Sequence, residues 1–265
     1  MGGWSLVVGA PWSSWAEQRL VECFKPLRGQ YGLAADNVRN VEMVLANSSI
    51  VEANAQVNPD PLRAPEGGGA NSGVVTIFDL STIPVHAVYG GIRVYSAAEA
   101  ESFMRALAGW QLRAGVFNVR ATVAALNSIG GTAAGLLYSE PAAARGAAFT
   151  AIADIPVRQT AMPPTNLSVL AVMQARDAAS AESERRDYRS VTTQMDADLY
   201  ADMFRFWAER AEAVYNRTGA NQTLVMQPVT AIAIQITAAT PWAYIRRTWP
   251  GGGLLSSTVE GRCQR

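Results

Sequence analysis

The sequence predicts an α+β fold in which a mostly antiparallel sheet is covered by helices. Short segments of alternating or β-branched residues recur along the chain, and turns of Asn, Ser, Gly or Pro separate them, as is typical of antiparallel strands. Two longer stretches, starting near residues 97 and 196, carry apolar residues at helical spacing. The economical arrangement places both helices on one face of the sheet, because each then buries its apolar side.

The first part of the chain contains a hairpin followed by a third strand. Apolar residues alternate along 41–46, the turn residues 47–49 follow, and Ile50 opens a second strand. Glycines precede the β-branched strand 74–78. Between these strands, residues 61–66 hold two prolines, each costing about 3 kcal/mol inside a helix, so we expect an irregular loop there.

The second part begins after Pro84, where the composition shifts. We expect a strand over 88–95, then a helix that starts with a capping box of Ser96 and Glu99. One face of this helix carries Ala100, Phe103, Leu107, Trp110 and Ala114, which we interpret as core residues.

Further elements follow in the same part. We expect strands over 116–125, 132–138, 224–227 and 232–236, an alanine-rich helix over 142–153, and a short helix capped by Thr165. The helix after Asp196 is predicted to bury one side and to end at Thr218-Gly219. That side carries Leu199, Met203, Phe206, Trp207, Arg210 and Val214. The predicted domains are therefore 1–84, 85–238 and an irregular tail, 239–265.

Composition excludes several classes of protein. Lys plus Arg and Asp plus Glu balance at 22 each and form no basic stripe, which argues against nucleic acid as a partner. The two cysteines, Cys23 and Cys263, have neither metal-ligand nor redox spacing, so we expect no metal site. Arg120 interrupts the longest apolar run, and we expect a soluble protein without a membrane segment.

Asn-X-Ser/Thr triplets favour a secretory origin. Four of them start at Asn47, Asn166, Asn216 and Asn221. The first residues of the chain do not form a signal peptide, because no basic region precedes an apolar core. Secretion would therefore require a leader on a longer form.

Several motifs together resemble a known family. They read Y-G-L-A-A-D-N-V at 31–38, V-L-A-N-S-S-I-V-E-A-N at 44–54, N-P-D at 58–60 and G-G-G-A-N-S-G-V-V-T at 67–76. This arrangement is similar to the PCMH-type FAD-binding domain of the FAD-linked oxidoreductases of the vanillyl-alcohol oxidase and berberine-bridge-enzyme-like family. Residues 136–141, 148–156 and 225–229 look like that family's substrate domain.

The resemblance implies an FAD-dependent oxidoreductase that oxidises a small organic substrate by hydride transfer to flavin, with O2 as acceptor. It implies flavin contacts, mainly through backbone groups, from Tyr31, Gly32, Gly69, Asn71, Gly73, Val74 and Val75. Tyr138 and Gln227 are candidate substrate contacts, with core packing or a solvent face as the alternative for each. The one histidine, His86, does not match the family's covalent-attachment motif.

Departures from the family pattern keep a second interpretation open. Residues 22–24, Glu-Cys-Phe, stand where the family has glycines, residues 61–66 replace an aromatic segment, and Ser72 replaces Phe. The upstream lobe with the main phosphate-binding loop has no counterpart, and the chain looks truncated at both ends. The alternative is a truncated, non-catalytic paralogue or fragment that binds no flavin, or binds an apolar small molecule.

Overall fold

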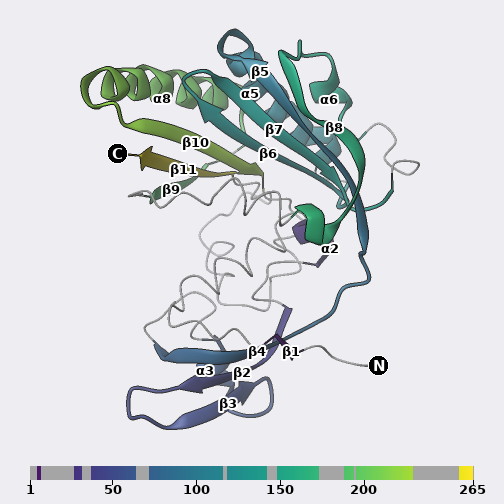
Figure 1. The fold of residues 1–265 in the computed structure, drawn as a ribbon, viewed down its shortest axis with the longest axis vertical. Coiled ribbons are helices and arrows are strands. Elements are labelled where there is room, and N and C mark those ends of the chain that lie inside the picture. Colours follow the sequence, from purple (N-terminus) through teal and green to yellow (C-terminus); the bar gives the residue numbers. More distant parts are fainter. Residues whose placement is uncertain are drawn as a thin grey trace. The chain divides into compact units, whose positions relative to one another are not determined.

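The structure is a computed structural model, and it describes residues 5–6, 27–31, 37–63, 72–115, 118–141, 148–172, 188–193, 195–228 and 257–264 (Figure 1). Among the described residues, those up to Pro84 belong to one compact unit and those from Val85 onward to a second. Each unit has its own sheet and its own apolar core.

The first unit is built on a four-stranded antiparallel sheet of order β1-β4-β2-β3. The strands are β1 (Ser5–Leu6), β4 (Val74–Leu80), β2 (Val38–Val44) and β3 (Ile50–Asn54), with the short helices α2 (Arg28–Tyr31) and α3 (Pro59–Arg63). The alternation predicted for residues 41–46 is present, because Val41 and Met43 are buried while Glu42 and Val44 are only partly covered. Ala53 and Phe78 complete this core.

Helix α3 corrects the expectation of an irregular loop, because residues 61–63 belong to it. Pro59 is its first residue and Pro61 its third. The first turn of a helix has no intrahelical partner for its N–H groups, so proline costs little there. Residues 64–66 of the expected loop lie outside the described residues.

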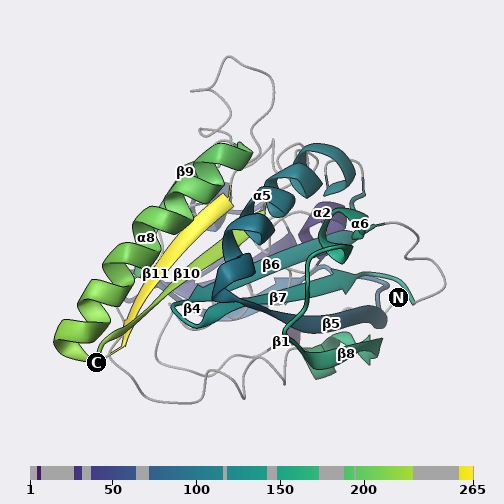
Figure 2. The same cartoon turned by 90° about the horizontal axis from the view of Figure 1, so that it is seen from above.

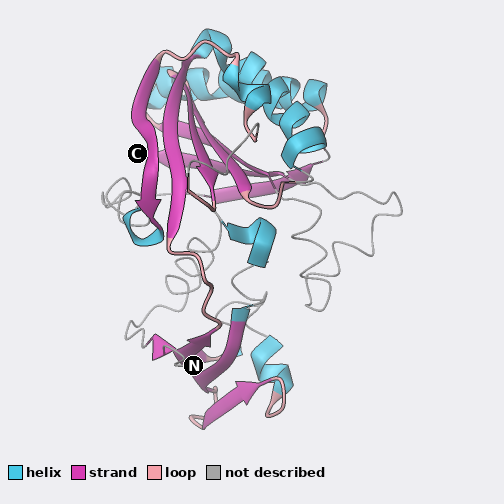
Figure 3. Cartoon of the chain, turned by 90° about the vertical axis from the view of Figure 1, so that its right-hand side faces the viewer, coloured by secondary structure: helices cyan, strands magenta, loops and turns pink. Residues whose placement is uncertain are grey.

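The second unit is a seven-stranded antiparallel sheet of order β8-β5-β7-β6-β10-β11-β9. In chain order its strands are β5 (Ala87–Ser96), β6 (Ala121–Ser128), β7 (Gly131–Tyr138), β8 (Gln159–Ser168), β9 (Tyr188–Thr193), β10 (Asn221–Pro228) and β11 (Ser257–Gln264). Helices α5 (Ala100–Trp110) and α8 (Ala197–Thr218) lie along the same face of this sheet (Figures 2 and 3). The predicted α+β fold with helices over an antiparallel sheet is confirmed.

Helix α5 buries Phe103, Leu107 and Trp110, as its spacing predicts. The predicted capping box is wrong, because Ser96 makes no side-chain cap. A 3₁₀ turn, η4 (Ala97–Glu99), separates Ser96 from the first residue of α5. At its other end α5 continues into a π-helical turn, η5 (Gln111–Gly115), where the Gln111 Oε1 accepts a hydrogen bond of 2.8 Å from the Tyr200 hydroxyl of α8.

Helix α8 begins and ends as predicted. The Asp196 side chain accepts the backbone N–H of Leu199 at 2.7 Å, and Gly219 closes the helix in the left-handed conformation with φ 70°. Its buried side differs from the predicted one, since Tyr200, Ala201, Phe204 and Ala211 are the buried residues. Of the predicted side, Trp207 packs against the core, whereas Leu199 and Phe206 are exposed.

Two further expectations are corrected by strands. Residues 159–168 form β8, so Thr165 caps no helix there. Strand β8 lies at an edge of the sheet, and Pro163 and Pro164 fall at the register shift between the pairs Gly90–Thr165 and Ile92–Met162, where the ladder does not require their N–H groups. Residues 257–264, expected in an irregular tail, form β11 between β10 and β9. The tail's sequence has no strand pattern of its own, so this pairing could not be predicted from it. Of the helix predicted over 142–153, the structure describes residues 148–153, and a short helix, α6 (Thr150–Ala153), forms there.

Candidate functional site

The candidate flavin site in the first unit centres on Gly73, which precedes β4. Its φ of +143° is a conformation that side chains disfavour, and a Cβ placed there would lie 2.7 Å from the Val44 carbonyl oxygen and 3.1 Å from Met43 Cε. Gly73 therefore lets the chain cross closely over the end of β2 before β4 begins.

The start of β4 presents main-chain groups on one edge. Val74 and Val75 pair with Val44 and Met43 of β2, while β1 pairs with β4 only at Phe78 and Asp79. Within the described residues no strand lies on the other side of β4 from Val74 to Ile77. Because backbone groups of alternate residues point to opposite sides of a strand, this edge offers every second N–H and C=O group between Val74 and Ile77 to a ligand.

Tyr31 is held in place by Asn37, which the sequence interpretation did not single out. The Asn37 Nδ2 donates to the Tyr31 carbonyl at 2.7 Å, and the Ser81 N–H donates to the Asn37 carbonyl at 2.8 Å. Asn37 is 8 % exposed, so it ties α2 to the neighbouring ends of β2 and β4. The signal was present as the Asn of Y-G-L-A-A-D-N-V, immediately before a strand.

The structure describes only part of the predicted set of flavin-contact residues. Tyr31, Gly73, Val74 and Val75 belong to the first unit, where Tyr31 and Val75 pack on the core around Val41 and Met43. Gly32, Gly69 and Asn71 lie outside the described residues.

Polar side chains cross the sheet of the first unit at the other end of β4, around Asp79. The Asn40 Nδ2 donates to Glu52 Oε2 at 2.5 Å and to Asp79 Oδ2 at 3.2 Å, and its Oδ1 accepts from Asn54 Nδ2 at 3.1 Å. These groups satisfy one another. No set of three His, Cys, Asp or Glu side chains in the described part of the chain is arranged to hold a metal.

The two candidate substrate residues lie in the second unit. Tyr138 is 5 % exposed and belongs to the core under the helices, with Ala121 and Tyr89 as its strand neighbours. Because Tyr138 is buried in this core, its environment favours core packing, the alternative to a substrate contact. Gln227 lies in β10, but its side chain is outside the described residues. His86 is exposed, before β5.

The face of this sheet opposite the helices is apolar and partly open. Along β6, Ala121, Val123 and Ala125 are buried toward the helices, while Ala124 and Leu126 alternate to the other side, where Leu126 is 37 % exposed. No described helix of the second unit covers that second face (Figures 2 and 3).

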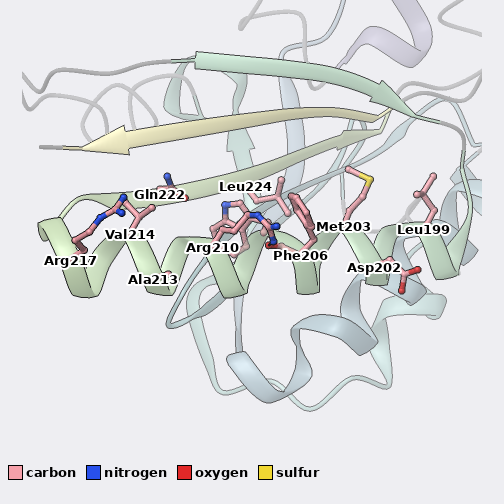
Figure 4. Close-up of a pocket in the computed structure, with 11 residues that line it drawn as sticks. Leu199, Asp202, Met203, Phe206, Arg210, Ala213, Val214, Arg217, Gln222 and Leu224 are labelled. Carbon is pink, nitrogen blue, oxygen red and sulfur yellow. The ribbon is translucent and has the colours of Figure 1, made fainter.

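An apolar groove of about 820 Å³ runs along α8 (Figure 4). Its described lining comprises Leu199, Asp202, Met203, Phe206, Trp207, Arg210, Ala213, Val214 and Arg217 of α8 with Gln222 and Leu224 of β10. This lining contains the whole side of α8 that the sequence predicted to be core. Phe206 is 59 % exposed, and the Arg210 guanidinium carbon lies 3.5 Å from the centroid of its ring.

Among the described residues no helix is both long and apolar enough to cross a bilayer.

Sequence comparisons connect the chain with FAD-dependent enzymes of fungi. It is 29 % identical over 182 residues to an FAD-dependent monooxygenase of Arthrobotrys oligospora, covering 68 % of this chain and 35 % of that protein. It is 51 % identical over 69 residues to an FAD-dependent monooxygenase of Fusarium proliferatum, covering 26 % of this chain and 13 % of that protein. The chain thus spans about a third or less of these relatives, and no family model matches it.

Solved structures share the fold. A xylooligosaccharide oxidase of Myceliophthora thermophila, solved with xylobiose, has a TM-score of 0.66 at 22 % identity, over 89 % of this chain and 52 % of its own. A berberine-bridge-enzyme-like protein of Physcomitrella patens has a TM-score of 0.65 at 14 % identity, over 91 % of this chain and 52 % of its own. Taken together, the sequence matches make the chain similar to fungal FAD-dependent oxidoreductases, and the solved structures show that it shares the fold of the xylooligosaccharide oxidase and of the berberine-bridge-enzyme-like protein.

Proposed function

We propose that this chain contributes to an FAD-dependent oxidoreductase that oxidises a small organic substrate, with O2 as the final acceptor. The observation that carries the proposal is the start of β4, where Gly73 crosses over Val44 and the next residues have an edge that no described strand pairs with. FAD, when bound, supplies the hydride acceptor for this chemistry.

The described residues fit a flavin through backbone groups. Gly73 permits the close crossing, the main chain of Val74 and Val75 offers hydrogen bonds, and Asn37 fixes the turn at Tyr31. The Tyr31 carbonyl is already engaged by Asn37, so its contribution is to shape the turn. For the substrate, Gln227 remains our candidate and Tyr138 does not.

The test is flavin retention by the purified full chain. After incubation with FAD and desalting, we expect visible absorbance in the flavin bands. Gly73→Ala should lose it, because the new Cβ meets the Val44 carbonyl at 2.7 Å. Gly130→Ala is the matched control, since its Cβ has only Ser128 Oγ near it, at 3.9 Å. A folded but colourless wild-type chain would overturn the proposal.

A second candidate function is favoured by the groove along α8. A non-catalytic chain that binds no flavin would still offer this apolar groove to an amphipathic carboxylate, with Arg217 at one end to meet the acid group. Titration with a fluorescent dodecanoate analogue tests it. Arg217→Met should weaken binding several-fold, and binding unchanged in Arg217→Met and Phe206→Ser would refute it.

For localisation we propose the secretory route. The support is the set of four Asn-X-Ser/Thr triplets. Fractionation of the source cells, with the protein followed by antibody, tests this, and a purely cytosolic signal would contradict it.

A further inference from the structure

The four Asn-X-Ser/Thr triplets are not equivalent in the folded chain. All four lie among the described residues, starting at Asn47, Asn166, Asn216 and Asn221. An acceptor needs a reachable carboxamide nitrogen and a hydroxyl two residues later, so the environment of these two groups separates the triplets.

Asn47 lies in the exposed turn between β2 and β3. Its Oδ1 accepts the Ser49 N–H at 3.0 Å and the Ser49 hydroxyl at 2.7 Å. Both bonds end on Oδ1, so neither engages Nδ2, the atom that takes a sugar. The hydroxyl of the triplet is therefore already placed on its own carboxamide.

This arrangement is local. The Leu45 N–H donates to the Ser49 carbonyl and the Ser48 N–H to the Leu45 carbonyl, each at 2.9 Å. Ser48 adopts φ 66° to close the turn. Every bond lies within residues 45–49, so the turn can form in a nascent chain before the sheet is assembled.

In the other three triplets, the hydroxyl or the carboxamide has a different environment. The Ser168 hydroxyl oxygen accepts the Ala171 N–H at 3.0 Å, and the Thr218 hydroxyl donates to the Val214 carbonyl at 2.8 Å. Asn221 lies in β10 opposite Gln264 of β11, and its Oδ1 is buried without a partner among the described residues. Because its Oδ1 is buried, the Asn221 carboxamide is less accessible than that of Asn47, which lies in an exposed turn.

We propose that Asn47 is an N-glycosylation site and that Asn221 is unmodified in the folded protein. The proposal rests on the proposed secretory route and is independent of flavin. The donor is a lipid diphosphate-linked oligosaccharide. Asn47 Nδ2 bonds to the anomeric carbon, the bond from that carbon to the diphosphate oxygen breaks, the Nδ2 proton goes to a base, and the lipid diphosphate leaves.

The test uses the full chain secreted from yeast behind a cleavable leader, which separates the acceptor question from the natural localisation. Glycans are removed with peptide N-glycosidase in heavy-oxygen water, which converts each glycosylated Asn into an Asp that carries heavy oxygen. Peptides are then mapped separately for the protein in the medium and for the protein retained in the cells. We expect label at Asn47 in both pools, and none at Asn221 in the secreted pool.

Variants sharpen the result. Asn47→Gln and Ser49→Ala should each lower the intact mass by one glycan, and Ser49→Ala keeps the asparagine itself. Asn221→Gln should leave the number of glycans on the secreted pool unchanged. Unlabelled Asn47 in both pools, or labelled Asn221 in the medium, would overturn the proposal even if the chain proves to bind flavin.

Discussion

The side-chain amide of Asn37 donates a hydrogen bond of 2.7 Å to the main-chain carbonyl of Tyr31. Asn37→Asp keeps the shape but replaces the donor by an acceptor, so two oxygens face each other. We expect the first unit to lose about 1–3 kcal/mol of unfolding free energy. Hydrogen exchange of the β2 and β4 amides measures it, with the β6 amides of the second unit as the internal control. Equal protection in wild type and variant would contradict the role given to Asn37.

Two glycines give opposite predictions for the same change. Gly73→Ala forces a Cβ against the Val44 carbonyl in a disfavoured conformation, at a cost of about 1–3 kcal/mol. Gly109 lies in α5 with no atom within 4 Å of the added carbon, so Gly109→Ala should gain about 1 kcal/mol from helix propensity. Thermal unfolding of both variants measures the difference. A stabilising Gly73→Ala would show that the crossing over Val44 is misassigned.

Phe204 and Phe206 of α8 should differ sharply. Phe204 is 8 % exposed in the core, so Phe204→Ala should cost about 3–5 kcal/mol. Phe206 is 59 % exposed, and Phe206→Ala should cost well under about 1 kcal/mol. Urea unfolding followed by the loss of helical circular dichroism compares them. If the two costs were reversed, the side predicted from the sequence would be the buried one after all.

Tyr95 should make the unfolding free energy of the second unit decrease at alkaline pH. Burial raises the pKa of its hydroxyl above 10, an effect that the Arg93 guanidinium partly offsets. The unfolded chain therefore ionises first, so this contribution to stability is complete below pH 10 and is lost as pH rises toward the folded pKa. We expect the unfolding free energy to fall above pH 10, and to fall less in Tyr95→Phe.

The same variant has an effect at neutral pH. The buried Tyr95 hydroxyl has no group among the described residues in hydrogen-bonding geometry, although the Arg93 guanidinium is near enough to act on its pKa. Tyr95→Phe removes that unpaired group and should stabilise the unit by about 1 kcal/mol near pH 7. A destabilised variant at neutral pH would mean that the hydroxyl does have a partner in solution, such as an ordered water.

The sequence predicts elements well where one local signal dominates. Asp196 and Gly219 bound α8 because a cap and a left-handed residue act within one turn. The buried side of α8 was missed because apolar residues stand on two sides of it, Phe204 on one and Phe206 on the other. Only the tertiary packing chooses between them.

Strands that depend on distant partners were harder to predict. Strand β8 holds Pro163 and Pro164 and becomes a strand through its pairing with β5 alone. Strand β11 has no period of its own and is fixed by β10 and β9. For the candidate site, the resemblance pointed to Gly73 and Tyr31, but the partner that holds Tyr31 required the contact with Asn37.

The two prolines of β8 also affect whether a strand from another chain can pair with this edge of the sheet. An incoming strand needs a regular ladder of N–H donors on the border it joins, and proline supplies none. This border should therefore reject β-strand addition from another chain, so that any self-association of the second unit must begin elsewhere on its surface.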